Sequence, residues 1–318
     1  CYLLGVPYPL RSKGRVLVEA IEKSNNKMVE ERLALLFNEI HHDLEASDYD
    51  ISHPEIMVGD LKWYTEKLNL IGNDSNGSGM DVLDFGCGTG FVSKTMSQNG
   101  FPYSKLVCLD PSLEMLNVAR TKLNGIPNLK FVRSLDEIQN NTFDLIAVNS
   151  VLHHFPNPGE LIKTLESFLK PGGRIIGGHG PNVGFTYNSL AMFAAKLYKK
   201  IGGEVSFPKD SVDGFNKRVQ ERWSGFPAVD QEEIQQIVDW HSPIEQNREG
   251  IAKGVGLAGR KFLTDNLKSC TIESYEEYTT YFERQGLAKV PWFSRFLEIA
   301  YRLFFPGNLF RYIVCKKD

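Results

Sequence analysis

The chain has 318 residues, 42% of them hydrophobic, and a formal net charge of −3 at pH 7. This length is sufficient for one large α/β domain with additions, and the composition suits an ordinary globular protein. Because basic residues are not in strong excess, nucleic acid is not expected as a partner. No apolar run is long enough to span a bilayer. The five cysteines are scattered and odd in number, without metal-binding spacing, which favours a reducing, cytoplasmic setting.

The N-terminal part, residues 1–79, is expected to be a helical segment. Apolar residues from 28 to 44 recur at helical spacing. Residues 41–55 are rich in His and carboxylate side chains, which are the usual ligands of a metal ion. The alternative, which we favour, is a lid before the first strand that binds no metal, with Tyr49 facing a pocket.

A glycine turn is the most informative feature of the chain. Residues 82–90 run from a short buried-strand pattern into this turn, and residues 91–96 read as the start of a helix. Glycines at Gly86, Gly88 and Gly90 allow backbone conformations closed to other residues and let a ligand approach the main chain. A loop of this kind between strand and helix holds nucleotide-like cofactors above the strand ends of α/β sheets.

The spacing of this turn indicates which cofactor it holds. The glycines follow G-x-G-x-G, and Phe91 stands where a dinucleotide fingerprint would have its third glycine. No Lys-Ser or Lys-Thr pair closes the loop, so it is not a P-loop. Asp84 precedes the glycines and would repel an anion, but not the ammonium and sulfonium groups of S-adenosylmethionine (SAM). The turn therefore favours SAM over NAD.

A second strand is predicted at Leu106–Leu109, and it ends in Asp110. An acid at this place can accept hydrogen bonds from both hydroxyls of a ribose. Pro111 and Met115 follow, and the residue beside the ribose acid is expected to lie against the adenine face.

The next elements alternate between strands and helices. Strands are predicted at 129–133 and 143–150, and a helix at 161–169 that the breakers at 171–173 stop. A fifth strand is predicted at 174–178. Strands alternating with helices imply a parallel sheet covered on both faces.

Four ordered motifs then identify a family. They are VLDFGCGTG (82–90), LDPSLEML (109–116), FDLIAVNSVLHHF (143–155) and LKPGG (169–173). The region from about Met80 to His179 resembles the core of class I SAM-dependent methyltransferases of the small-molecule type. The resemblance implies an α/β, Rossmann-like doubly wound fold. Its sheet would be seven-stranded and mostly parallel, with an N-terminal helical lid, a helical cap insertion and SAM as cofactor.

Carried onto this sequence, the resemblance implies a set of cofactor-binding residues: Asp84, Gly86, Cys87, Gly88, Gly90, Asp110, Pro111, Met115, Ser134, Leu135, Asn149 and Ser150. The glycines would approach the methionine part of SAM, with Asp84 supporting its ammonium end, and Asp110 would hold the ribose. Family members often place an acid after the third strand for the adenine amino group. Here Ser134 and Leu135 occupy that region, so adenine recognition falls to Ser134, to backbone groups or to a shifted Asp136.

The methyltransferase domain is expected to span residues 80–318, with the SAM-binding core at 80–180. The insertion at 181–268 is longer than such a core needs, and its aromatic content favours an ordered substrate cap. Residues 269–318 would supply the last two strands, near 269–275 and 309–315, and a helix between them.

That helix, from Trp292 to Phe305, has a very broad apolar face. A helix of this kind can lie on a membrane or contact lipid. We favour the other interpretation, in which the face packs against the sheet or the neighbouring cap.

Histidines after the fourth strand are the candidates for catalysis. Methyl transfer mainly needs alignment of the reacting atoms, and a hydroxyl or acidic carbon acceptor also needs a general base. His153 and His154 are placed for that role, and His179 after the fifth strand is a weaker substrate-side candidate. Histidines in this position also occur as purely structural residues.

The expected function is methyl transfer from SAM to an oxygen or carbon of a small or medium-sized organic acceptor. The fourth strand lacks an N-P-P-[YF] signature, which argues against a nucleobase or amide nitrogen as the methylated atom. The alternative is a SAM-fold protein without methyl transfer, such as a cofactor-binding regulatory or scaffolding subunit, or an enzyme using SAM in another reaction.

Overall fold

A computed structural model describes most of the predicted core. The described residues are 27–53, 56, 60–75, 77–138, 142–181, 210–223, 259–278 and 309–317. The helix predicted from Trp292 to Phe305 lies outside these ranges, as does most of the insertion at 181–268.

The core is one seven-stranded sheet in the order β3-β2-β1-β4-β5-β7-β6. The strands are β1 (Met80–Phe85), β2 (Tyr103–Leu109), β3 (Leu129–Val132), β4 (Phe143–Asn149), β5 (Leu169–Pro181), β6 (Cys270–Tyr278) and β7 (Leu309–Lys316). Strands β1 to β5 pair in parallel, and β7 runs antiparallel to both β5 and β6. The predicted mostly parallel, seven-stranded sheet is therefore confirmed.

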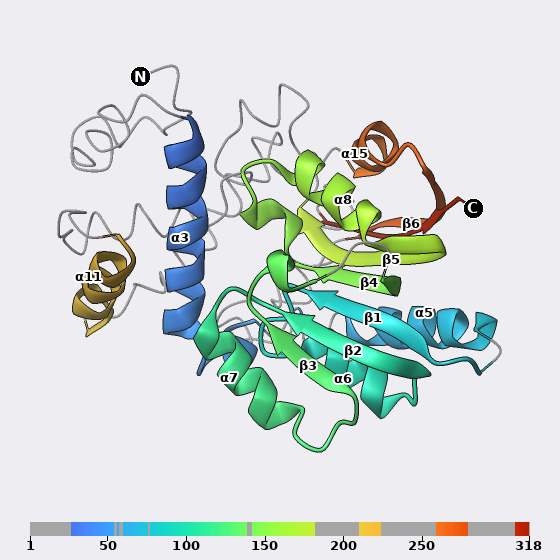
Figure 1. Ribbon diagram of the computed structural model, residues 1–318, viewed down its shortest axis with the longest axis horizontal. Coiled ribbons are helices and arrows are strands. Elements are labelled where there is room, and N and C mark those ends of the chain that lie inside the picture. Colours follow the sequence, from blue (N-terminus) through green and yellow to red (C-terminus); the bar gives the residue numbers. More distant parts are fainter. Residues whose placement is uncertain are drawn as a thin grey trace, which may run out of the picture.

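Helices cover both faces of this sheet (Figure 1). The longer ones are α3 (Lys27–Glu45), α5 (Leu61–Asp74), α6 (Phe91–Gln98), α7 (Leu113–Lys122), α8 (Pro158–Ser167), α11 (Asp210–Arg222) and α15 (Gly259–Asn266). Helices α8 and α15 lie on one face, and α5, α6 and α7 pack into the cluster on the other. Helix α3 crosses the edge toward which the parallel strands point, and α11 packs on α3 (Figure 1).

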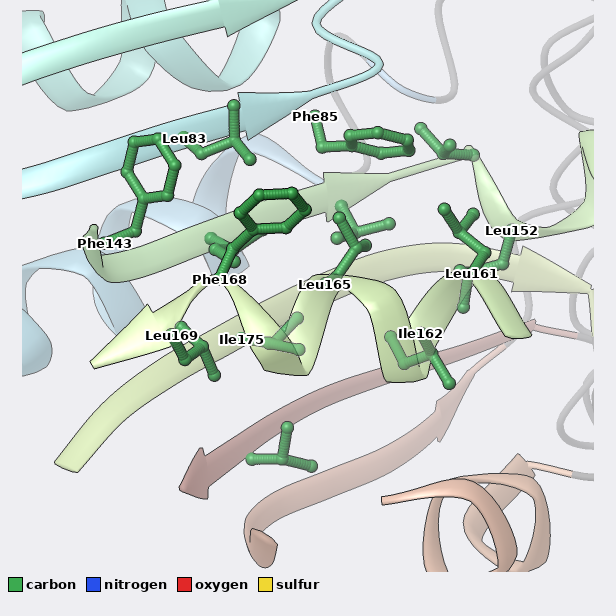
Figure 2. Close-up of a cluster of buried hydrophobic side chains, with 14 of the residues drawn as sticks. Leu83, Phe85, Phe143, Leu152, Leu161, Ile162, Leu165, Phe168, Leu169 and Ile175 are labelled. Atoms are coloured by element: carbon green, nitrogen blue, oxygen red, sulfur yellow. The ribbon is translucent and has the colours of Figure 1, made fainter. Parts of the chain in front are cut away.

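Alternate residues of the strands supply two apolar cores, because successive side chains of a strand point to opposite faces. Leu83 and Phe85 of β1 belong to the cluster under α8, whereas Val82 belongs to the cluster under α5 and α6. Figure 2 shows the first cluster, where Leu161 and Leu165 of α8 lie against the sheet. This packing fixes the strand ends that carry the site.

The junction between α8 and β5 differs from the prediction. The helix ends at Ser167, and Leu169, predicted as its last residue, already pairs with Phe143 of β4. The register shifts between Phe143 and Leu145, where Leu145 pairs with Arg174. The Pro-Gly-Gly breakers thus lie in an irregular start of β5, which the strand pairing holds, and not in a loop between helix and strand.

Helix α15 lies within the range predicted as a substrate cap. Its Phe262 and Leu263, with the following Leu267, belong to the apolar cluster under α8. This part of the insertion therefore packs on the core, and the division into core and cap remains a prediction. None of the helices in the described part of the chain is long and apolar enough to cross a membrane.

Candidate active site

A cavity of about 500 Å³ lies at the carboxyl ends of the parallel strands, and residues of α3 line it. The sheet order reverses between β1 and β4, and such a switch point is where open α/β sheets bind ligands. Cavities of this size hold small molecules and cofactors. The lining residues are Leu35, Leu36, Asn38, Glu39, His42, Tyr49, Phe85, Gly86, Gly88, Leu109, Asp110, Pro111, Ser112, Met115, Arg133, Ser134, Leu135, Asn149, Ser150, Val151, His154 and Phe155.

The glycine turn forms the floor of this cavity. Gly86 has φ of 66°, and a Cβ there would come within 2.4 Å of Val151. Gly88 has φ of 50°, and a Cβ would meet nothing within 4 Å, so a ligand has open access to its backbone. Gly90 does not line the cavity; it is the left-handed N-cap of α6.

Asp84 and Cys87 lie behind the floor and do not line the cavity. The Asp84 carboxylate, 1% exposed, accepts hydrogen bonds from the backbone N–H of Ser93 at 3.0 Å and from its hydroxyl at 2.6 Å. These bonds attach the end of β1 to the first turn of α6. Burial raises the pKa of Asp84 to about 6, although the Ser93 bonds oppose the rise. The buried Cys87 donates its backbone N–H to the carbonyl of Leu109.

Because its pKa is raised on folding, Asp84 should make the chain less stable as pH rises. The folded state binds the Asp84 proton more tightly than the unfolded state does. Protonation of Asp84 therefore stabilises the fold fully below about pH 4, and this stabilisation is lost as pH rises through about 6. We expect the unfolding free energy of Asp84→Asn, relative to that of the natural chain, to rise by about 2 kcal/mol as pH is raised from about 4.5 to 7.5. Urea unfolding at a series of pH values measures this difference. Asp81→Asn is the matched control: burial would raise the pKa of Asp81, but hydrogen bonds from Lys170 and Ser104 and the nearby lysine charges together lower it. If the difference in unfolding free energy between Asp84→Asn and the natural chain did not change with pH, the raised pKa of Asp84 would be contradicted.

Asp110 organises the cavity beside the glycine turn. Its Oδ2 accepts the N–H of Gly88 and its Oδ1 the N–H of Ser112, both at 2.9 Å. Burial raises the pKa of Asp110, while the charge of His42 and the two backbone bonds lower it. Pro111 and Met115 line the same wall, and their contact with adenine stays a prediction.

The covering helix α3 is held over the cavity by carboxylates. Glu39 pairs with Arg133 at 2.9 Å and with Arg222 of α11 at 3.0 Å. Asp43 accepts the Ser112 hydroxyl at 2.6 Å and pairs with Arg222 at 3.0 Å. Burial raises the pKa of Glu39, against the charges of both arginines. Nothing in the sequence marks these residues, because their partners are far away along the chain.

A second attachment joins the short helix α4 (Tyr49–Ser52) to the glycine turn. Asp50 accepts the Thr89 hydroxyl at 2.6 Å and the Lys122 ammonium at 2.5 Å, and Lys122 also donates to Thr89. Tyr49 beside it lines the cavity. Tyr49 therefore reaches the cavity from a helix attached to the glycine turn, and its role as a lid residue stays a prediction.

Imidazole rings from two separate segments meet at the cavity. His42 of α3 and His154 of the short helix η3 (Leu152–His154) both line it, with ring centroids 5.0 Å apart. Burial alone would lower the pKa of His42, but the bond at 2.7 Å and the charge of Glu45 raise it. His153 is buried beside His154 and does not line the cavity. Among the described residues, no three His, Cys, Asp or Glu side chains are grouped to hold a metal ion.

The end of β4 supplies a polar wall. Asn149 and Ser150 line the cavity, and the Ser150 N–H donates to the carbonyl of Gly178 at 2.9 Å. The Oδ1 of Asn149 is buried, and no described residue donates a hydrogen bond to it. A buried carbonyl oxygen of this kind normally has a partner, so a ligand donor in the cavity would satisfy it.

The adenine region predicted after β3 also lies at the cavity. Ser134 and Leu135 line it, whereas Asp136 does not. The Ser134 hydroxyl accepts the N–H of Asp136 and bonds its carboxylate at 3.2 Å, which caps the short helix η2 (Leu135–Glu137). The shifted Asp136 is thus engaged in this turn.

His179 was predicted to follow the fifth strand, but β5 extends to Pro181, so His179 lies within it; it does not line the cavity. Its Nδ1 lies 3.2 Å from the carboxylate of Asp60, which is fully buried. Asp60 also pairs with Arg311 and accepts the Tyr278 hydroxyl, both at 2.9 Å. The substrate-side role predicted for His179 remains a prediction, and the cluster itself joins α5 to the far edge of the sheet.

The residues of the cavity fit SAM. Open space over Gly88, a carboxylate on Asp110 and the unsatisfied Oδ1 of Asn149 match a cofactor with an amino acid end and a ribose. Fold and cavity together define a Rossmann-like domain that binds a nucleoside-type cofactor at the switch point of its sheet.

Comparison with known proteins agrees with the resemblance drawn from the motifs. Residues 83–177 match the family described as a methyltransferase domain. The demethylmenaquinone methyltransferase of Lactococcus lactis is 30% identical over 48% of this chain and 60% of its own length. The malonyl-[acyl-carrier protein] O-methyltransferase of Halalkalibacterium halodurans is 30% identical over 36% of this chain and 45% of its own. The chain thus spans about half the length of the curated relatives it matches.

Solved structures of low identity also align. The SAM-dependent methyltransferase from Mesorhizobium loti is 18% identical, with a TM-score of 0.44 over 75% of this chain and 92% of that one.

Proposed function

We propose that this protein transfers the methyl group of SAM to an oxygen or carbon of a small or medium-sized organic acceptor. The observation that carries the proposal is the cavity at the switch point. There Gly88 leaves its backbone open and Asp110 presents a buried carboxylate, within a methyltransferase domain. The acceptor class is supported by relatives whose names describe O-methyltransferases acting in ubiquinone biosynthesis and on malonyl-[acyl-carrier protein].

In this proposal the chain's own residues bind, orient and shield the reactants. SAM, when bound, supplies the electrophilic methyl group. The backbone at Gly86 and Gly88 would hold its methionine part, and Asp110 the ribose. Helices α3 and α4 cover the cavity, which excludes water and strengthens the electrostatic interactions inside it. Catalysis would rest mainly on alignment of the acceptor atom with the methyl group.

The acceptor is expected to have an apolar body. Part of the lining is aliphatic and aromatic, on α3, at the end of β1 and around η3: Leu35, Leu36, Phe85, Val151 and Phe155. Apolar walls with a few polar groups are typical of sites that bind organic ligands. A quinone-like or lipid-like acceptor suits such walls.

Calorimetric titration of the purified chain with SAM and with S-adenosylhomocysteine tests the cofactor site. Micromolar binding of both is expected, followed by formation of S-adenosylhomocysteine from SAM when an acceptor is supplied. Binding without transfer to any quinone, phenol or acyl acceptor would instead favour a SAM-binding regulatory or scaffolding subunit. Absence of binding of both ligands would contradict the proposal.

His154 should carry any base catalysis, because it lines the cavity and His153 does not. We expect His154→Ala to lower kcat by about 100-fold or more while the Kd for S-adenosylhomocysteine changes less than about twofold. His153→Asn is the matched control, and it should keep most of the turnover while lowering stability, since it alters a buried side chain. Equal kcat for His154→Ala and the natural chain would reduce His154 to a structural role.

A further inference from the structure

A buried amide on the covering helix has no partner of its own. Asn38 of α3 is 7% exposed and lines the cavity. Its Oδ1 is buried, and no described residue donates a hydrogen bond to it. Leaving such a group unsatisfied costs about 1–3 kcal/mol, and buried polar atoms in native proteins are nearly always paired. An unpaired amide that lines a cavity therefore points to a ligand.

The place of Asn38 identifies which part of the ligand it meets. The next residue, Glu39, pairs with Arg133 at 2.9 Å, and Arg133 directly precedes Ser134 and Leu135 at the end of β3. Those two residues line the region predicted for adenine. Helix α3 therefore brings Asn38 to the adenine end of the cavity.

Other polar side chains at that end already have partners. Ser134 is engaged with Asp136 in the cap of η2. Glu39 is paired with two arginines, and Arg133 also donates to the carbonyl of Pro111 at 2.8 Å. Asp136, the shifted acid, does not line the cavity. Asn38 is the buried side chain of this group that keeps its hydrogen-bonding capacity for a ligand.

The chemistry of an amide matches the edge of adenine. A carboxamide presents a carbonyl acceptor beside an N–H donor, and adenine presents its amino group beside a ring-nitrogen acceptor. Two parallel hydrogen bonds form between such groups, and this pairing discriminates against the wrong base. We propose that Asn38 reads the adenine of SAM in this way, from the covering helix and not from the sheet. The proposal rests on SAM being the cofactor of the proposed function.

Binding of the cofactor adenine to Asn38 would also affect how α3 covers the cavity. Because Asn38 stands on α3, the two hydrogen bonds would also hold the cover in place once the cofactor is bound. The adenine end of the cofactor would thus complete the closed cavity before an acceptor is methylated. A ligand that lacks the amino group would lose both affinity and part of this closure.

Paired titrations with S-adenosylhomocysteine and S-inosylhomocysteine, in which an oxo group replaces the adenine amino group, test the proposal. The natural chain should prefer the adenosyl ligand by about 10-fold or more, as one bidentate pair allows. Asn38→Leu should lose at least about 10-fold in affinity for it and bind the two ligands about equally. Thermal unfolding should not show a lower Tm for Asn38→Leu, because the substitution removes an unsatisfied buried amide.

Asn117→Leu is the matched control, since Asn117 is exposed on α7, its side chain bonds Glu114 and Arg120 of the same helix, and its backbone carbonyl accepts the Thr121 hydroxyl. It should leave both affinities unchanged. An unchanged preference in Asn38→Leu would overturn the assignment of Asn38 while the proposed function stands. If the natural chain bound neither ligand, the proposed function and this inference would fall together.

Discussion

Replacing Asp110 with alanine should weaken binding of SAM and S-adenosylhomocysteine by about 100-fold or more. Hydrogen bonds to a charged acceptor contribute about 1.5–3 kcal/mol each, and the ribose would lose two of them. The glycine turn would also lose its anchor, because Asp110 accepts the N–H of Gly88. Calorimetric titration of the variant with both ligands measures the loss directly.

Two further variants separate the ribose contact from the general effect of losing a charge. Asp110→Asn keeps one oxygen acceptor and should retain more affinity than the alanine variant. Asp136→Ala removes an acid that lies near β3 but does not line the cavity, and it should change the affinity by less than about twofold. Unaltered affinity in Asp110→Ala would show that the ribose site lies elsewhere.

Replacing Asp60 with alanine should destabilise the fold by about 3–5 kcal/mol, the cost of removing one partner of a buried ion pair. Asp60 is fully buried, and Arg311, whose side chain is 9% exposed, lies 2.9 Å from it. Without the carboxylate, the Arg311 charge remains buried and Tyr278 loses its acceptor. Urea unfolding at neutral pH gives the difference in unfolding free energy.

Asp74→Ala is the matched control for this variant. Asp74 also pairs with an arginine, Arg174 at 3.1 Å, but its side chain is 61% exposed. Solvent screens such pairs, so a loss of no more than about 1 kcal/mol is expected. If both variants lost the same stability, burial of the Asp60 cluster would not explain its contribution.

The sheet could be predicted from the sequence because its signals are local. The glycine turn after β1 and the acid after β2 mark strand ends within a few residues, and buried parallel strands read as short apolar runs. The start of β5 could not be predicted in this way. Leu169 is held in the sheet by its pairing with Phe143, a contact across 26 residues that overrides the apparent helical pattern before it.

The candidate site was predictable where motif residues lie at the strand ends. Gly88, Asp110 and Asn149 were all expected near the ligand, and all three line the cavity. The position of a residue in a motif does not show whether its side chain reaches the cavity, however. Asp84 is buried behind the glycine turn, where it accepts a hydrogen bond from Ser93.

Residues of the covering helix could not be found from the sequence. Helical periodicity shows that α3 has a buried face, but not what that face covers. Asn38 and Glu39 reach the cavity only because α3 folds back across residues nearly 100 positions later, such as Arg133. The partner of His179 was hidden in the same way, since Asp60 lies 119 positions earlier.

The attachment of α4 to the glycine turn has a kinetic consequence. Thr89 belongs to the loop that would hold the cofactor, and it bonds both Asp50 of the lid and Lys122 of α7. The lid cannot swing away without releasing the loop, so opening and loosening of the cofactor occur as one event. In the proposed function, departure of the spent cofactor would then be a gated step of the kind that can set the turnover rate, whichever acceptor is methylated.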